Sequence, residues 1–213
     1  MTKHRKPEQW IDHILEVAAE ELVKGGYSGL TMDAIALRTA LSKGGVYRFF
    51  PNKQAVALAL FTKHYKELLE FDVQDAIDWN ISISDTIHRI LFGQWEGTSQ
   101  DVNQRIWVEL ISETQRDTAF FEERQRLLLL LRGKFRLLLE RLALRDCLEI
   151  DVHIISKLDT TLFLGIALME GLVLQGAGGT YFGEQSTLAR RFIEVMLNDV
   201  FGVIHVGNED NRS

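Results

Sequence analysis

The chain has 213 residues, 46% of them hydrophobic and 25% charged, and its net charge at pH 7 is −6. This composition excludes a disordered chain and, with only two prolines, favours an all-α protein, and the patterns along the chain predict about nine helices. The single cysteine excludes an internal disulfide and fits the cytoplasm, and charges interrupt every apolar run before it could form a signal peptide or a membrane span.

The N-terminal segment predicts a basic arm followed by an amphipathic helix. Residues 1–7 are rich in lysine, arginine and histidine, and we expect them either to contact a nucleic acid or to form an unstructured tail. Apolar residues recur at three- and four-residue spacings from Glu8 to Lys24, which is the pattern of a helix that buries one face. The pair Gly25-Gly26 is expected to end this helix.

The segment Leu30–Ala59 predicts two short helices joined by a tight turn. Thr31 is a good N-cap for the first helix, and Ser42 is a good N-cap for the second. Pro51 stops the second helix, and Asn52 can cap a third one. Two short helices joined by a turn of this kind form the helix-turn-helix of DNA-binding proteins.

The composition of the second short helix favours contact with DNA. Gly44 and Gly45 each cost about 1 kcal/mol in a helix interior, but glycine lets the backbone approach a ligand closely. The neighbouring side chains supply the hydroxyl, cationic and phenolic groups that bond phosphates and base edges, namely Ser42, Lys43, Tyr47 and Arg48. The alternative is an ordinary capped surface helix with a buried tyrosine.

The run from Ser42 to Phe50, followed by Asn52-Lys53, resembles the recognition helix of TetR-type transcriptional repressors. The preceding run, Leu30 to Ala36, resembles the first helix of the same motif, so the match covers about a quarter of the chain. Two positions depart from the family pattern: an alanine, Ala40, stands in the turn where glycine is usual, and Arg48 stands where histidine is common. The first departure is expected to strain the turn.

The resemblance implies a set of DNA-contacting residues and a division of the chain. Lys43 is the expected base reader, and the full set is Thr31, Ser42, Lys43, Gly44, Gly45, Tyr47, Arg48 and Lys53. We expect a DNA-binding domain in residues 1–53 and an effector-binding and dimerisation domain in residues 54–213. The first carries 8 basic and 6 acidic residues and the second carries 16 and 24, so the acidic part would repel DNA from the wrong face.

The rest of the chain predicts further helices. One is expected from Lys53 to about Trp79, and the cation at its start suggests an anion nearby, such as a phosphate. Ser82 and Asp85 form a capping box that opens another helix through Trp95. Two more helices are expected in residues 101–115 and 117–144.

The last two predicted helices are apolar on more than one face. They occupy residues 151–177 and 186–203, and a helix that is apolar all round must be buried. The resemblance implies that these helices form a four-helix interface between two subunits of a homodimer. The alternative is that they are ordinary core helices.

A pocket for a small, apolar or aromatic effector is expected among the middle helices. The candidate walls and polar groups are Phe61, Tyr65, His88, Phe92, Gln94, Trp95, Trp107, Glu109, Thr161 and Phe163. Aromatic residues at helical spacing are also typical of a plain core, so both interpretations stay open.

The resemblance implies a repressor that binds a palindromic double-stranded DNA operator as a homodimer. Half-sites would lie about 34–36 Å apart, and an effector that changes the spacing of the two recognition helices would release the DNA. The operator, the effector, the regulated genes and the choice between repression and activation are not given by the sequence.

Two other classes of function remain as alternatives. For an enzyme, the six histidines lack metal-binding spacing, Cys147 has no neighbouring histidine, and the glycine run at 176–179 ends a helix rather than following a strand. We therefore expect no catalytic residue, no metal and no cofactor. A helical module that binds protein or RNA is the third class, and competition between double-stranded DNA and RNA would separate it from a DNA-binding regulator.

Overall fold

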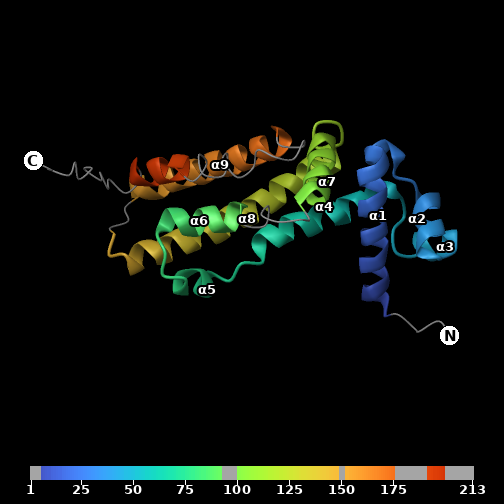
Figure 1. Cartoon of the computed structure of the whole chain (residues 1–213), viewed down its shortest axis with the longest axis horizontal. Helices are drawn as coiled ribbons and strands as arrows, with labels where there is room; N and C mark the ends of the chain where they lie inside the picture. The colour runs from blue at the N-terminus through green and yellow to red at the C-terminus, as the bar shows by residue number, and fades with distance from the viewer. Residues whose placement is uncertain (1–5, 93–99, 149–151, 176–190, 200–213) are drawn as a thin grey trace, which may run out of the picture. The chain divides into compact units, whose positions relative to one another are not determined.

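The computed structural model describes residues 6–92, 100–148, 152–175 and 191–199, and the regular structure in these ranges is entirely helical (Figure 1). The all-α prediction is confirmed. The helices are α1 (Pro7–Gly29), α2 (Met32–Thr39), α3 (Lys43–Tyr47), α4 (Lys53–Leu69), α5 (Val73–Asp78), α6 (Ile83–Phe92), α7 (Gln100–Glu113), α8 (Thr118–Arg145) and α9 (Val152–Gln175), and residues 191–199 are also helical.

The helices group into two compact units. Unit 1 comprises Met1–Glu70 and Gly97–Leu129, and unit 2 comprises Phe71–Glu96 and Leu130–Ser213. Helix α8 is continuous and contributes its first part to unit 1 and its second part to unit 2. Neither unit begins or ends at residue 53, and the functional boundary there stays a prediction.

The N-terminal helices of unit 1 share one small core. Helix α1 packs against α2 and α4, and α2 packs against α3. The apolar residues at the centre are fully buried, and they are Ile14, Leu22, Leu30, Ile35 and Val46. Helices of five and eight residues are too short to be stable alone, so α3 and α2 depend on this packing.

The three predicted N-caps are confirmed. The Thr31 hydroxyl accepts from the backbone N–H of Ala34 at 3.2 Å, and the Ser42 hydroxyl accepts from Gly45 at 3.1 Å. The Asn52 side chain accepts from the N–H of Ala55 at 2.8 Å. Each cap satisfies a helix N–H that has no partner within its own helix, which fixes where α2, α3 and α4 begin.

The glycine pair ends the first helical segment of α1, as predicted, and a second, short segment follows it. Gly26 has φ 63° and ψ −176°, which makes a kink, and the chain then forms one more helical turn to Gly29. The N–H of Leu30 donates to the carbonyl of Gly26 at 3.2 Å and closes that turn. The Glu109 carboxylate accepts from the N–H of Tyr27 at 3.1 Å, so α7 supplies a partner that the local sequence does not reveal.

The predicted helix from Lys53 to Trp79 is wrong, because α4 ends at Leu69 and α5 begins at Val73. The cause is Asp72, whose carboxylate accepts from the N–H groups of Gln74 at 2.7 Å and Asp75 at 3.0 Å. A side chain that caps a new helix competes with continuation of the old one.

Two hydrogen bonds attach α4 to the start of α8. Gln54 Nε2 donates to Asp117 Oδ2 at 2.5 Å, and the Thr62 hydroxyl donates to Glu123 Oε1 at 2.7 Å. Arg126 also donates to Glu123, and this bond is the main reason that the pKa of Glu123 is lowered. Both attachments lie within unit 1.

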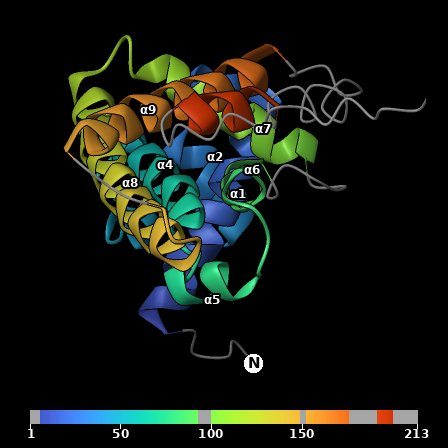
Figure 2. The ribbon, with the colours of Figure 1, turned by 90° about the vertical axis from the view of Figure 1, so that its left-hand side faces the viewer.

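Unit 2 contains α5, α6, the second part of α8, α9 and the helical residues 191–199. The predicted capping box at α6 is confirmed, since Ser82 Oγ accepts from the N–H of Asp85 at 3.1 Å and donates to its carboxylate at 2.8 Å. Helix α6 packs against α9 (Figure 2), where a Cβ built on Gly165 would lie 3.6 Å from Leu91. The predicted extension of α6 to Trp95 lies outside the described residues.

Helix α8 ends with a Schellman turn around Cys147. The N–H of Leu148 donates to the carbonyl of Ala143 at 2.8 Å, and the N–H of Cys147 donates to that of Leu144 at 3.3 Å. Cys147 itself has φ 56°, a conformation for which glycine is the usual choice.

Candidate nucleic-acid interface

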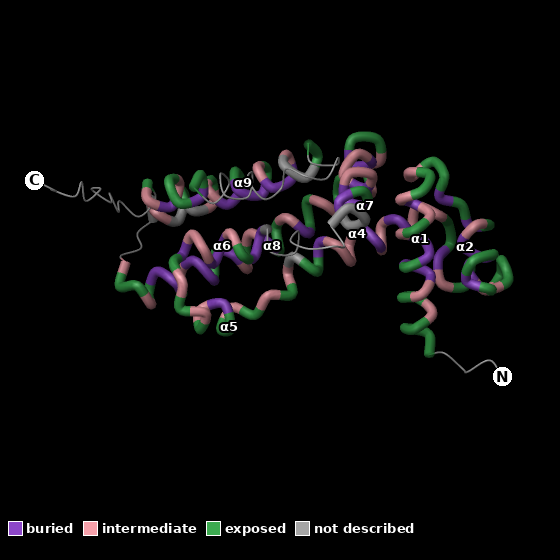
Figure 3. The backbone as a smooth tube through the Cα atoms, viewed as in Figure 1, coloured by how far each residue is buried: buried purple, intermediate pink, exposed green. Residues whose placement is uncertain are grey.

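Helix α3 is anchored on one side and exposed on the other. Val46 is fully buried and Phe50 is 7% exposed, so they hold the helix against the core. Lys43, Gly44 and Tyr47 are exposed. In Figure 3 the tubes of α1 and α2, against which this motif packs, carry both buried (purple) and exposed (green) residues. The Tyr47 side chain is 49% exposed, which removes the alternative of a buried tyrosine.

The two glycines of α3 have different surroundings. A Cβ on Gly45 would lie 3.3 Å from Ser42 Oγ and 3.4 Å from the Leu41 Cβ, so a side chain there would crowd the N-cap. A Cβ on Gly44 would meet no described atom within 4 Å. Packing within the motif therefore explains why residue 45 is a glycine. It does not explain Gly44, which leaves an exposed position of α3 without a side chain.

The turn between α2 and α3 is strained at the position where the sequence departs from the family pattern. Ala40 has φ 56° and ψ 23°, which is the left-handed region. A residue with a Cβ costs about 1–2 kcal/mol there. The expected strain is present, and the surrounding packing of α1, α2 and α3 holds the turn in place.

The predicted base reader, Lys43, is held by a carboxylate. Its ammonium lies 2.8 Å from Asp33 Oδ1, and both side chains are 66% exposed. The hydrogen bond with Asp33 is the main reason that the pKa of Lys43 is raised. Lys43 is thus charged at neutral pH and directed toward α2.

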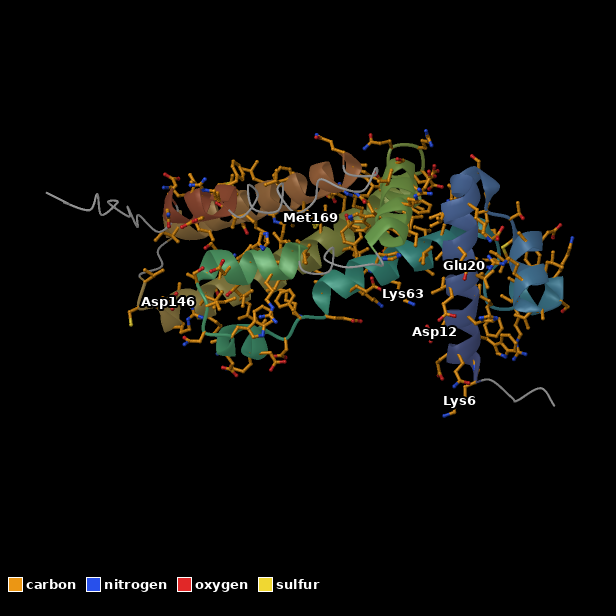
Figure 4. The ribbon with its side chains drawn as sticks, in the orientation of Figure 1. Lys6, Asp12, Glu20, Lys63, Asp146 and Met169 are labelled. Atoms are coloured by element: carbon orange, nitrogen blue, oxygen red, sulfur yellow. The ribbon has the colours of Figure 1, made fainter. Side chains whose placement is uncertain are left out.

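A second ion-pair group attaches α2 to α1. Arg38 Nη1 donates to Glu21 at 2.8 Å, and Arg38 Nη2 contacts Glu20, which is labelled in Figure 4. The Glu20 contact raises the pKa of Arg38 and lowers that of Glu20. Because Arg38 on α2 pairs with both Glu20 and Glu21 on α1, these ion pairs help to fix the orientation of α2 against α1.

Lys53 has partners that the sequence did not predict. Its ammonium donates to the carbonyl oxygen of Tyr27 at 3.1 Å and lies 4.5 Å from the centre of the Tyr27 ring. The positive charge of Lys53 at the start of α4, which predicted a phosphate nearby, is therefore stabilised in part by a carbonyl oxygen and an aromatic ring. An ammonium has three donors, so Lys53 retains capacity for a further acceptor.

The remaining predicted contacts lie on the exposed surface of the motif. Thr31 and Ser42 use an oxygen lone pair to cap their helices, and each hydroxyl retains a proton to donate. Arg48 is exposed at the C-cap of α3. Seven of the eight predicted DNA-contacting residues therefore lie on α3, at its ends or at the start of α2, and the eighth, Lys53, begins α4.

The predicted pocket residues of unit 1 form a close-packed aromatic cluster. Tyr65 and Trp107 have ring centres 4.5 Å apart, and Phe61 lies 4.9 Å from Tyr65. All three are at most 1% exposed. Glu109, which was predicted to orient an effector, bonds the kink of α1 instead.

The predicted pocket residues of unit 2 are more exposed. His88 and Thr161 are of intermediate burial, and Phe163 is 59% exposed. The side chain of Phe92 and the residues Gln94 and Trp95 lie outside the described part of the chain. Among the described candidates, the structure brings together the three aromatic residues of unit 1.

Helix α9 and residues 191–199 combine buried and exposed apolar side chains. Met169, labelled in Figure 4, is fully buried. The exposed apolar side chains of these two segments are Phe163, Leu164, Leu174, Phe192 and Val195. Lys157 on α9 lies 3.8 Å from Asp199 Oδ2, which links the segments.

Neither a metal site nor a membrane span is found in the described part of the chain. No group of three or more histidine, cysteine, aspartate or glutamate side chains there could hold a metal ion. No helix described has the length and hydropathy to cross a bilayer.

Comparison with known proteins agrees with this geometry. Residues 14–60 match the family model described as "Bacterial regulatory proteins, tetR family". The chain is 33% identical over 79 residues to the uncharacterised HTH-type transcriptional regulator YhgD of Bacillus subtilis (strain 168), a match that covers 37% of this chain and 41% of that protein. The chain thus matches less than half the length of this relative.

Solved structures share the fold over almost the whole chain. A protein of Mesorhizobium loti assigned to the TetR-family regulators has 13% identity and a TM-score of 0.72, with 92% of this chain and 98% of that chain covered. Salmonella enterica GusR has 14% identity and a TM-score of 0.69, with 95% and 100% covered. The fatty acid degradation regulator FadR of Bacillus halodurans has 15% identity and a TM-score of 0.65, with 92% and 97% covered.

Proposed function

We propose that this chain is a transcriptional regulator of the TetR family, which its match over residues 14–60 supports, and that it binds a palindromic double-stranded DNA operator as a homodimer and represses transcription in the cytoplasm. The observation that carries this proposal is the exposed face of α3. It presents Lys43, Tyr47 and Arg48 beside Gly44, where no side chain of the helix prevents close approach. A single helix of this length contacts few base pairs, so two copies are needed for specificity.

The exposed apolar side chains of α9 and residues 191–199 support the homodimer. Leu164, Leu174, Phe192 and Val195 would each leave water if the two segments packed against their copies in a second subunit. Two subunits related by a two-fold axis would each present one α3 helix, and we expect the two helices to enter successive major-groove turns on one face of the DNA. This arrangement requires the operator to be palindromic.

We propose that a small apolar or aromatic effector releases the DNA by favouring a different spacing of the two α3 helices. An effector shifts this equilibrium only if it binds one spacing more tightly than the other. The candidate aromatic side chains of unit 1, Phe61, Tyr65 and Trp107, are closely packed, whereas Phe163 in unit 2 is 59% exposed, so unit 2 is the better place for it. His88, Thr161 and Phe163 are the candidates there.

The experiment that tests DNA recognition starts with selection of bound sequences from a random duplex library. Gel-shift titration of the selected site then compares Tyr47→Ala with Phe121→Ala, because Phe121 on α8 is 47% exposed and provides a matched aromatic control. We expect Tyr47→Ala to weaken binding about 5- to 150-fold, which corresponds to the loss of one good contact of about 1–3 kcal/mol, and Phe121→Ala to leave it unchanged. Equal affinities for the two variants, or selection of no sequence, would contradict the proposal.

A further inference from the structure

An acidic side chain, Asp33, lies beside the proposed DNA-contacting surface of α3, where its negative charge would repel phosphates. Asp33 is in the first turn of α2, is 66% exposed, and contacts the Lys43 ammonium through both oxygens, at 2.8 Å and 2.9 Å. The start of α2 is already capped by Thr31, so capping does not require this carboxylate. A negative charge in the first turn favours the helix, but that effect does not require contact with Lys43.

Without Asp33 beside it, the Lys43 ammonium would attract the phosphates of DNA of any sequence. A lysine ammonium is a point charge on a flexible stem, and it attracts every phosphate that it can reach. Each such contact adds affinity that is independent of sequence and depends on salt. With Asp33 in contact, the pair has no net charge, so it adds little attraction to the phosphate backbone.

We propose that Asp33 is a specificity-determining residue that acts through Lys43, an inference that rests on the proposed DNA-binding function. The carboxylate keeps the lysine from phosphates and itself repels them. At a G·C base pair the same two side chains are favoured, because guanine O6 and N7 accept from a lysine and the cytosine amino group donates to a carboxylate. Asp33 therefore lowers affinity for random DNA more than affinity for the operator.

The test is a double-mutant cycle on the full chain with Asp33→Asn, Lys43→Ala and the double variant. The affinity of each protein is measured for the site selected by the wild-type protein and for a scrambled duplex, at several salt concentrations. We expect Asp33→Asn to bind the scrambled duplex several-fold more tightly, with a salt slope steeper by about 0.9, the value for one added phosphate contact. The ratio of specific to random affinity should fall, and it should fall clearly less when Lys43 is already alanine, because only the direct repulsion between Asp33 and the phosphates is then removed.

Two controls make the result decisive. Asp33→Glu restores a carboxylate and should return the ratio toward the wild-type value, and thermal melting should show that all variants are folded. Three results would each overturn the inference: an unchanged ratio of specific to random affinity in Asp33→Asn, a ratio in Asp33→Glu as low as that in Asp33→Asn, or a fall caused by Asp33→Asn that is as large in the Lys43→Ala background as in the wild type. Failure of the wild-type protein to select any site would instead overturn the proposed function.

Discussion

Replacing Gly26 with alanine should destabilise unit 1 strongly. The backbone of Gly26, with φ 63° and ψ −176°, lies in a region that is accessible almost only to glycine, and a residue with a Cβ costs about 1–3 kcal/mol there. The new Cβ would also lie 2.9 Å from Glu109 Oε2, so the carboxylate would have to leave the N–H of Tyr27. Loss of that charge-assisted hydrogen bond adds about 1.5–3 kcal/mol, for a total of about 2.5–6 kcal/mol.

Gly25→Ala is the matched control, because a Cβ on Gly25 meets no described atom within 4 Å and its φ is not positive. That change should stabilise the helix by about 0.5–1 kcal/mol. Urea denaturation followed by circular dichroism gives both free energies of unfolding. In a Glu109→Ala background, Gly26→Ala should cost only its backbone strain. Similar effects at positions 25 and 26, or full additivity with Glu109→Ala, would refute the reasoning.

Three further predictions concern other local features. Gly44→Ala should leave thermal stability unchanged or higher and weaken operator binding in a gel shift, whereas Gly45→Ala should lower the melting temperature because its Cβ crowds Ser42. Loss of stability in both variants would argue against the distinction. Cys147→Gly should stabilise the chain by up to about 1 kcal/mol in urea denaturation, because it removes the left-handed strain at the end of α8. The pKa of Glu123 is lowered in the folded state, mainly by Arg126, so its contribution is present above about pH 4.5 and is lost as the pH falls through the folded pKa. Acid denaturation should therefore be less steep in Glu123→Gln, and identical profiles would show that the contact is not stabilising.

Local signals predicted much of the fold because they are satisfied within a few residues. Thr31, Ser42, Asn52 and the Ser82–Asp85 pair each bond an N–H no more than three residues away, so sequence spacing is sufficient to find them. The break at Asp72 was missed although it is also local. An aspartate is common enough on helix surfaces that its capping role was outweighed by the apolar pattern around it.

Long-range contacts explain what the sequence could not give. The kink at Gly26 depends on Glu109, and the partner of Lys53 is a carbonyl 26 residues away. Neither contact leaves a pattern in the local sequence. The pairing of Lys43 with Asp33 was also missed, although the two residues lie on the adjacent helices of the motif and have opposite charges. The packing of α2 against α3 was the information that was lacking.

The attachment of α4 to α8 has a mechanical consequence. The two hydrogen bonds, at Gln54 and Thr62, are eight residues apart and thus about 12 Å apart along the helix axis. A helix fixed at one point can swing, whereas a helix fixed at two points moves only together with the body to which it is fixed. We therefore expect α4 and the first turns of α8 to move together, so that a displacement of α4 is shared between two helices.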